Sequence, residues 1–424
     1  MRKAVLSLLS LSFLIFTGCF KDDDTPIIIE EITIINEGGG NGGGEDCPTI
    51  SVSGAITSDT TWTSDNIYVL NQKVVVDAGA TLTIQAGTII KGTAGTGSLA
   101  SALIVARDAS INAVGTPTQP IIFTSASDNI SCGETSGTNL DENDRGLWGG
   151  LIVLGNAPCS FSGDVSELQI EGIPADDTFG LYGGADAGDN SGVIQYVSIR
   201  HGGALIGEGN EINGLTLGGV GNGTVIDNVE VVANVDDGIE FFGGTVDASN
   251  LLVWAQGDDA LDIDQAYSGT IDNAVVVLGD FSDHALEIDG PEGTTNGQFT
   301  LQNLTLIGNL NTDNGEYADY RSNAQGASNN IFAFGFKDGS DVELDNDGVA
   351  TNYNNGDLTF SNWEIVLPAG VTNVEDIFVN KAETVTVTGF GTEASAVTQG
   401  SQTVGATTSA LSWTYSNTAG NLGF

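Results

Sequence analysis

A short acidic phrase that recurs three times constrains the fold of this chain more than any other sequence feature. Each copy places an acidic pair before alternating apolar and charged residues, and the copies start 22 and 25 residues apart. They read Asp-Asp-Gly-Ile-Glu-Phe-Phe at 236–242, Asp-Asp-Ala-Leu-Asp-Ile-Asp at 258–264 and Asp-His-Ala-Leu-Glu-Ile-Asp at 283–289. Because successive side chains of a strand point to opposite faces, the alternation predicts strands with a buried apolar face and an outer acidic face.

The same organisation continues on both sides of this stretch. From about residue 65, short alternating apolar runs are separated by Gly or Asn, as at 74–76, 82–84, 103–105, 121–123 and 194–199. No amphipathic helical pattern of useful length follows the N-terminal segment. Strands this short cannot bury a face alone, but coils of about 20–30 residues can do so when they stack as a solenoid.

An Asn just before a strand recurs once per coil and sharpens this prediction. It occurs at Asn228, Asn250, Asn273, Asn303, Asn330 and Asn362, with spacings of 22, 23, 30, 27 and 32 residues. Asn tolerates the left-handed conformation of a turn, and its amide can bond to neighbouring coils. The pattern resembles the asparagine ladder of right-handed parallel β-helices of the pectate-lyase type. A β-propeller or a β-sandwich is the alternative.

The predicted fold class is therefore all-β, a single right-handed parallel β-helix with an asparagine ladder. We expect the helix and its N-terminal cap to span residues 47–366, and residues 367–424 to form the last coils or a C-terminal β cap. The runs at 79–92, 120–125, 148–151 and 411–415 also look like a group of secreted β-helix lipoproteins of no established activity.

The N-terminal segment is typical of an exported lipoprotein. Residues 1–18 contain two basic residues and an apolar run that is short for a membrane span, which predicts a signal peptide. The end of this segment resembles a lipobox, which implies lipidation of Cys19. The following Phe-Lys-Asp-Asp-Asp at 20–24 resembles the surface-export signal of Bacteroidota lipoproteins, whereas the alternative is an acidic linker of a periplasmic lipoprotein. Residues 19–46 are predicted to be an acidic, Gly-rich tether.

The charge balance restricts the possible partners. The chain has 56 Asp and Glu against 11 Lys and Arg, a net charge of -45. This charge argues against nucleic acid or an anionic membrane surface as a partner. It fits a solvated extracellular protein that binds cations, and the alternative is that the acidity only maintains solubility. We expect a monomer.

Three cysteines remain beside Cys19. An exported location permits disulfides, and Cys132 and Cys159 flank a loop-rich insertion, so we predict that they pair and that Cys47 is free. Pairing of Cys47 with either of the others stays open.

The outward positions of the recurring phrase predict a metal site. Alignment of the coils gives one outward column of Thr216, Glu240, Asp262, Glu287 and Asp319, and a second of Phe242, Asp264, Asp289 and Arg321. Stacked carboxylates repel one another unless a cation or a proton intervenes, and such hard oxygen donors suit Ca²⁺. The predicted ligands are Glu240, Asp262, Asp264, Glu287 and Asp289. Alternatively, these side chains splay into water and Arg321 neutralises part of the charge.

A second interpretation is catalytic and rests on a resemblance. Asn234-Val235-Asp236, Asp258-Asp259, Asp283-His284 and Arg321 follow the order of the polygalacturonase motifs Asn-Thr-Asp, Asp-Asp, Gly-His-Gly and Arg-Ile-Lys. The resemblance implies that Asp259 protonates the leaving group, that Asp236 or Asp258 activates water, that His284 supports the pair and that Arg321 holds a sugar carboxylate. His284 lacks the flanking glycines, and Arg321 has no lysine two residues on.

Taken together, the sequence favours a binding protein over an enzyme. We expect a surface-exposed outer-membrane lipoprotein whose β-helix binds an extracellular ligand, with a glycan favoured, and carries structural Ca²⁺ on an acidic face. The alternative is a polysaccharide-degrading hydrolase or lyase that uses the face between residues 236 and 289 together with Arg321.

Overall fold

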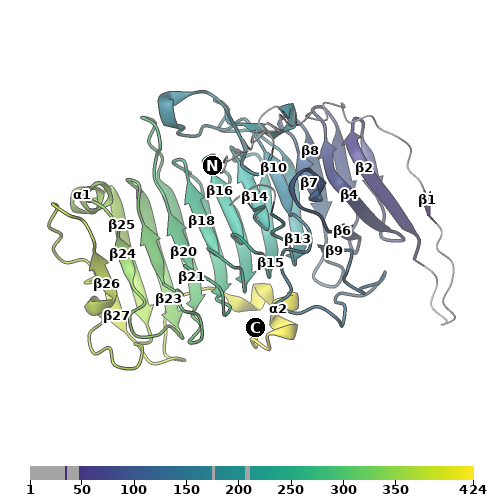
Figure 1. Ribbon diagram of the computed structural model, residues 1–424. Helices are drawn as coiled ribbons and strands as arrows, with labels where there is room; N and C mark the ends of the chain where they lie inside the picture. The colour runs from purple at the N-terminus through teal and green to yellow at the C-terminus, as the bar shows by residue number, and fades with distance from the viewer. Residues whose placement is uncertain (1–33, 36–46, 174–176, 206–210) are drawn as a thin grey trace, which may run out of the picture.

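The computed structural model describes residues 34–35, 47–173, 177–205 and 211–424, and this part of the chain is dominated by one elongated parallel β-helix (Figure 1). Strands of successive coils pair in parallel along its length, which confirms the predicted β-helix and excludes a propeller or a sandwich. Crossovers between parallel strands are right-handed, as predicted for this helix. The predicted signal peptide and Cys19 lie outside the described residues.

Each coil of the central region contains one short strand, and these strands stack into a sheet that we call the acidic sheet. Each pairs in parallel with the next. The strands are β7 (Ala102–Val105), β10 (Leu151–Leu154), β14 (Leu215–Gly218), β16 (Ile239–Phe242), β18 (Leu261–Asp264), β20 (Leu286–Ile288), β22 (Ala318–Tyr320), β24 (Val342–Leu344) and β26 (Phe378–Asn380).

A second strand in each coil is long and bent. The bend separates two faces, since the first half of β13 pairs with β8 and its second half with β9. The short strand and the two halves thus give each coil three sides. These strands are β13 (Gly192–Arg200), β15 (Val225–Val232), β17 (Ala248–Trp254), β19 (Thr270–Val277), β21 (Phe299–Ile307), β23 (Gly326–Phe334), β25 (Leu358–Ile365) and the shorter β27 (Ala394–Ala396).

The N-terminal coils are built from β2 (Thr49–Ile56), β3 (Thr60–Trp62), β4 (Ile67–Val76), β5 (Thr81–Ile84), β6 (Ile89–Gly92), β8 (Ser110–Val114) and β9 (Ile121–Ser125). β1 (Ile34–Ile35) pairs antiparallel with β2, and β11 (Leu168–Gln169) with β12 (Leu181–Tyr182). The two α-helices of the described chain are α1 (Asp347–Asn355) and α2 (Tyr415–Ala419). Neither they nor any other described helix is long and apolar enough to cross a membrane.

The bend of the long strands is made by the predicted Asn column. All six residues have a left-handed backbone with φ between 54° and 61°, a conformation that Asn adopts more readily than most residues. Their amides bond from coil to coil: Asn273 Nδ2 donates to Asn250 Oδ1 at 2.6 Å, and Asn330 Nδ2 to Asn303 Oδ1 at 3.1 Å. Asn362 Nδ2 continues the series to Asn330 Oδ1 at 3.0 Å. The asparagine ladder is confirmed.

The interior of the helix is one continuous apolar core. The alternate residues of the recurring phrase, such as Ile239, Phe241 and Ile263, are buried in it. The residues between them therefore point outward, as the alternation predicts. The register of the acidic sheet is fixed by this burial, because a slip of one residue would place carboxylates in the core.

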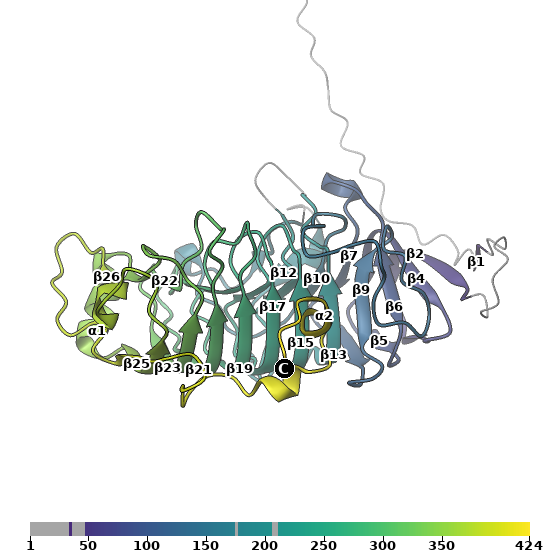
Figure 2. The same cartoon turned by 90° about the horizontal axis from the view of Figure 1, so that it is seen from below.

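Residues after β27 return along the outside of the helix (Figure 2). Thr403, Ala406 and Thr407 hydrogen-bond in turn to side chains of β25, β21 and β19. Leu411 then packs on Trp254 of β17, and the first residues of α2 hydrogen-bond to Glu230 of β15. We call residues 403–424 the C-terminal strap. Its path is not apparent from the sequence.

The disulfide differs from the prediction. Cys47 is bonded to Cys132, with a Cα–Cα distance of 5.9 Å, and Cys159 is unpaired. The predicted Cys132–Cys159 pair is wrong because the two residues pack against different parts of the helix. Cys132 lies with Cys47 beside the first coils, whereas Cys159 contacts a separate apolar cluster around Phe242. Burial raises the pKa of the Cys159 thiol to about 12.

Candidate functional site

The acidic sheet carries the predicted outward column. Its register pairs Thr216 with Glu240, Glu240 with Asp262, Asp262 with Glu287 and Glu287 with Asp319. The sequence alignment of the coils is therefore confirmed in this column. The column continues one coil further, because Asp319 pairs with Glu343 of β24. Neighbouring carboxylates lie one strand spacing apart, roughly 4.8 Å, and all of them are buried.

The turns before these strands bring a second row of acids to the same face. Asp237 Oδ1 accepts a hydrogen bond from the backbone N–H of Asp259 at 2.9 Å, one coil further on. Asp259 Oδ1 in turn accepts the backbone N–H of His284 at 2.7 Å and lies 2.8 Å from its Nδ1. The second acid of each pair thus holds the next turn in place. Asp236, Asp258 and Asp283, which precede them, also line the site.

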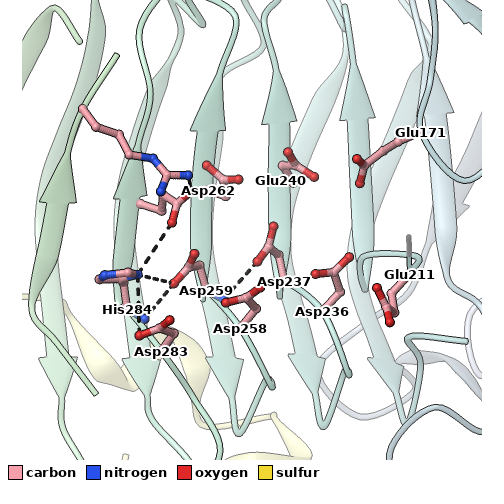
Figure 3. A pocket seen from close by; sticks show the side chains of 12 residues that line it. Glu171, Glu211, Asp236, Asp237, Glu240, Asp258, Asp259, Asp262, Asp283 and His284 are labelled. Carbon is pink, nitrogen blue, oxygen red and sulfur yellow. Dashed lines mark hydrogen bonds and ion pairs between the residues drawn. The ribbon is translucent and has the colours of Figure 1, made fainter. Parts of the chain in front are cut away.

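Between the two rows lies a groove of about 440 Å³. Figure 3 shows the strand-borne Asp262 and Glu240 facing the turn-borne Asp259 and Asp237. Ten carboxylates line the groove, and two basic side chains accompany them. The lining residues are Glu171, Glu211, Asp236, Asp237, Glu240, Asp258, Asp259, Asp262, Asp283, His284, Glu287 and Arg321.

All five residues of the catalytic hypothesis line this groove, and so do three of the five predicted metal ligands, Glu240, Asp262 and Glu287. Asp289 lies beside it and binds Arg321 Nε at 2.7 Å. Asp264 is outside the lining and accepts a hydrogen bond from the N–H of Gln265 at 2.5 Å.

Two groove residues, Glu171 and Glu211, were not predicted from the sequence. Glu171 follows the β11 strand and Glu211 precedes β14, so both come from segments outside the repeated phrase, and no repeat marks them. Asp237 was expected among the acids of the turns that adjoin the metal site, although not as one of its five ligands. Asn213, whose Nδ2 donates to Glu240 Oε2, was also missed, and the coil alignment could have found it.

Crowding and burial make ionisation of these acids unfavourable. Burial, followed by repulsion from Glu171, raises the pKa of Asp236 to about 7, and burial and Asp259 raise the pKa of Asp258 to about 6. Burial also raises the pKa of Asp237, Glu240 and Asp262 well above the ordinary value. Each of these groups therefore gains from a proton or a cation nearby.

The two basic residues neutralise one end of the groove. Burial alone would lower the pKa of His284, but its hydrogen bond to Asp259 raises that pKa to about 9. His284 is therefore an imidazolium at neutral pH, and it also lies 3.6 Å from Glu287. Arg321 forms ion pairs with Glu287 and Asp289. The carboxylates further from this end have no such partner among the described basic residues.

Several acid groups have the spacing that a metal ion requires, and one of them fits best. The ligand atoms of Asp237, Glu240 and Asp262 lie within 4.8 Å of one another, and this group contacts no basic side chain among the described residues. Asp262 is 8% exposed, and its Oδ1 has no hydrogen-bond partner. A buried carboxylate oxygen without a partner is costly. Three carboxylates of this kind are the hard oxygen donors that Ca²⁺ prefers.

Three of the four other possible metal groups contain or contact a basic side chain of the protein. Asp259, His284 and Glu287 form one group, and Asp262, Glu287 and Asp289 form another. His284 lies within the first and Arg321 contacts the second. A third, more distant group of Glu316, Asp341 and Glu343 is contacted by Lys381. The fourth, Asp236, Asp237 and Asp258, shares Asp237 with the preferred group and contacts no basic side chain among the described residues.

The fold and the groove together define a β-helical protein whose one face carries an acidic groove. The profile of the pectate-lyase-like β-helix domain matches residues 54–418, which is most of the chain. The protein therefore belongs to this family. No significant match to a curated protein or to a solved structure was found.

Proposed function

We propose that this protein binds an extracellular glycan in the acidic groove, and that a calcium ion held by Asp237, Glu240 and Asp262 takes part in the site. The observation that carries the proposal is the buried Asp262 Oδ1 without a partner, beside two further carboxylates. Calcium would satisfy this oxygen and offset the burial and the mutual repulsion that raise the pKa of all three groups. Membership of a pectate-lyase-like family is compatible with a polysaccharide ligand.

The calcium site is tested by titration of the metal-free protein with Ca²⁺ in a calorimeter. Asp262→Asn removes the charge with little change of shape, and we expect it to raise the Kd for calcium at least about tenfold, because the ion loses one anionic ligand. Asp313→Asn is the matched control, since Asp313 is an exposed acid outside the groove. Absence of calcium binding to the wild type, or equal affinity in all three proteins, would contradict the site.

Hydrolysis of a polysaccharide is the second candidate function, and a specific observation favours it. Asp236 and Asp258 have pKa values of about 7 and 6, so each can hold a proton near neutral pH, as a general acid must. Asp259 is engaged by the backbone and ring of His284, which makes Asp258 or Asp236 the better proton donor in this candidate.

A panel of polysaccharides separates the two functions. The binding proposal expects calcium-dependent affinity for at least one glycan without release of reducing ends or unsaturated sugars. Release of such products by the wild type, and its loss in Asp258→Asn, would establish the enzyme instead. Affinity for no member of the panel would count against both.

We also propose that the protein is a monomer anchored by lipid at Cys19 to the outer surface of the outer membrane. The lipobox-like sequence and the acidic segment at 20–24 support this location. Labelling with a radioactive fatty acid should mark the wild type but not Cys19→Ala, and external protease should degrade the anchored protein on intact cells. An unlabelled wild type would refute the lipid anchor.

A further inference from the structure

One arginine of this highly acidic protein makes no hydrogen bond and no ion pair through its side chain in the described structure. Eight Lys and Arg residues lie in the described ranges, and seven of them donate a hydrogen bond or form an ion pair. The exception is Arg145, for which the described residues provide neither a hydrogen-bond acceptor nor a carboxylate within 4.0 Å. A guanidinium offers five donors in a fixed planar fork. In a chain with 56 acidic residues, a half-buried guanidinium without a hydrogen-bond or ion-pair partner requires an explanation.

The Arg145 side chain lies along the rim of the groove. The next residue, Gly146, is fixed by its N–H to the carbonyl of Gly202 at 2.6 Å. From there the guanidinium reaches over the ring of Phe281, with its central carbon 4.5 Å from the ring centroid. The guanidinium also lies close to Gly257, because a Cβ built on this glycine would be 3.1 Å from Arg145 Nη1. Gly257 directly precedes Asp258 of the groove, and Phe281 is two residues before Asp283.

Phe281 and its neighbour on the next coil form an apolar surface at this rim. Phe281 is 64% exposed and Leu310 is 69% exposed, the two highest values among the large apolar side chains described. The turns that carry them are joined, because Asn309 Nδ2 donates to Asp280 Oδ1 at 2.9 Å. A large exposed aromatic ring beside a binding groove is a contact surface rather than part of a core.

We propose that Arg145 and Phe281 form a ligand-contacting subsite for a sugar residue that carries a carboxylate or a sulfate. The apolar face of the sugar ring packs on Phe281, with Leu310 extending this surface, and the anionic group accepts hydrogen bonds from the guanidinium. The stacking of Arg145 on Phe281 holds the planar fork in place before the ligand arrives. Charge-assisted bonds from a guanidinium to an anion are among the stronger hydrogen bonds in proteins.

This subsite rests on the proposed glycan-binding function and specifies its ligand. The centre of the groove would repel an anionic sugar unless calcium is bound there, whereas the rim offers a guanidinium that forms no ion pair among the described residues. Burial lowers the pKa of Arg145, and the nearby Asp280 carboxylate opposes this shift without contacting the guanidinium. An acidic glycan would thus be held at two points, through the calcium in the groove and through Arg145 at the rim. A neutral glycan would use the apolar surface alone.

The test compares three oligosaccharides of equal length in the presence of calcium: an oligogalacturonide, a sulfated oligosaccharide and a neutral xylo-oligosaccharide. Binding is measured by calorimetry for the wild type, Arg145→Gln and Phe281→Ala. We expect Phe281→Ala to weaken binding of every bound probe by roughly tenfold, as for the loss of an aromatic anchor. Arg145→Gln should weaken binding of the charged probes by about the same factor and leave the affinity for the neutral probe unchanged. Comparison of the two charged probes decides between carboxylate and sulfate.

Two controls keep the outcomes separate. In the first, both variants should bind calcium as the wild type does, which shows that the groove is intact. In the second, Leu99→Ala removes an exposed apolar side chain of the N-terminal coils and should leave binding of every probe unchanged. If the wild type binds a charged probe and Arg145→Gln binds it equally well, the subsite is overturned while glycan binding stands. If the wild type binds none of the probes, the proposed function itself is contradicted.

Discussion

Replacement of Glu230 by alanine is expected to lower the free energy of unfolding by about 3–5 kcal/mol, because it leaves a buried charge without its partner. Glu230 is fully buried on β15, and Arg200, which is 2% exposed, lies 4.0 Å from it. The carboxylate also accepts hydrogen bonds from the backbone and hydroxyl groups of Ser416, each at 2.6 Å. The substitution therefore also releases the end of the C-terminal strap.

Glu364 provides a matched control for this prediction. It accepts hydrogen bonds from Thr403 of the same strap, but on the exposed outside of β25 and without a buried basic partner. Glu364→Ala should lower the free energy of unfolding by less than about 1 kcal/mol. The melting temperature and chemical denaturation of both variants would be compared with those of the wild type. Equal losses in the two variants would show that the strap contact matters and the buried charge does not.

The calcium-free protein is expected to lose stability as the pH rises from 5 to 8, by about 2–4 kcal/mol. Carboxyl groups of an unfolded chain titrate near pH 4, whereas the pKa values of Asp236 and Asp264 in the fold are about 7. Between these values the folded protein holds more protons than the unfolded chain, so each rise in pH favours unfolding. His284 acts in the same direction, because its folded pKa of about 9 exceeds the ordinary 6.5.

The measurement is the melting temperature against pH, with a chelator and with excess calcium. Calcium should flatten the curve if it takes the place of protons in the groove. Asp236→Asn combined with Asp264→Asn should also flatten the calcium-free curve, whereas Asp313→Asn should leave its slope unchanged. A calcium-free protein that becomes more stable between pH 5 and 8 would refute the assignment of the raised pKa values.

The repeated part of the site was predictable because it follows from local rules. Alternation placed Ile239 and Ile263 inside, so Glu240 and Asp262 had to point outward. The Asn column then fixed the register, and the carboxylates of successive coils were expected to stack. The disulfide was not predictable, because the partner of Cys132 depends on where a loop outside the repeat is placed. For the same reason the contributions of Glu171 and Glu211 were missed.

The sequence by itself determined the solenoid, its asparagine corner and the outward acid column, since each depends on a residue pattern that repeats in every coil. The tertiary structure alone decided which acids keep an unpaired, buried oxygen, as Asp262 does, and which are neutralised, as Glu287 is by Arg321. It also decided that Arg145 lies over Phe281 and that the C-terminal strap returns to Glu230. These contacts join residues far apart in the chain, and their partners follow no period that the sequence could display.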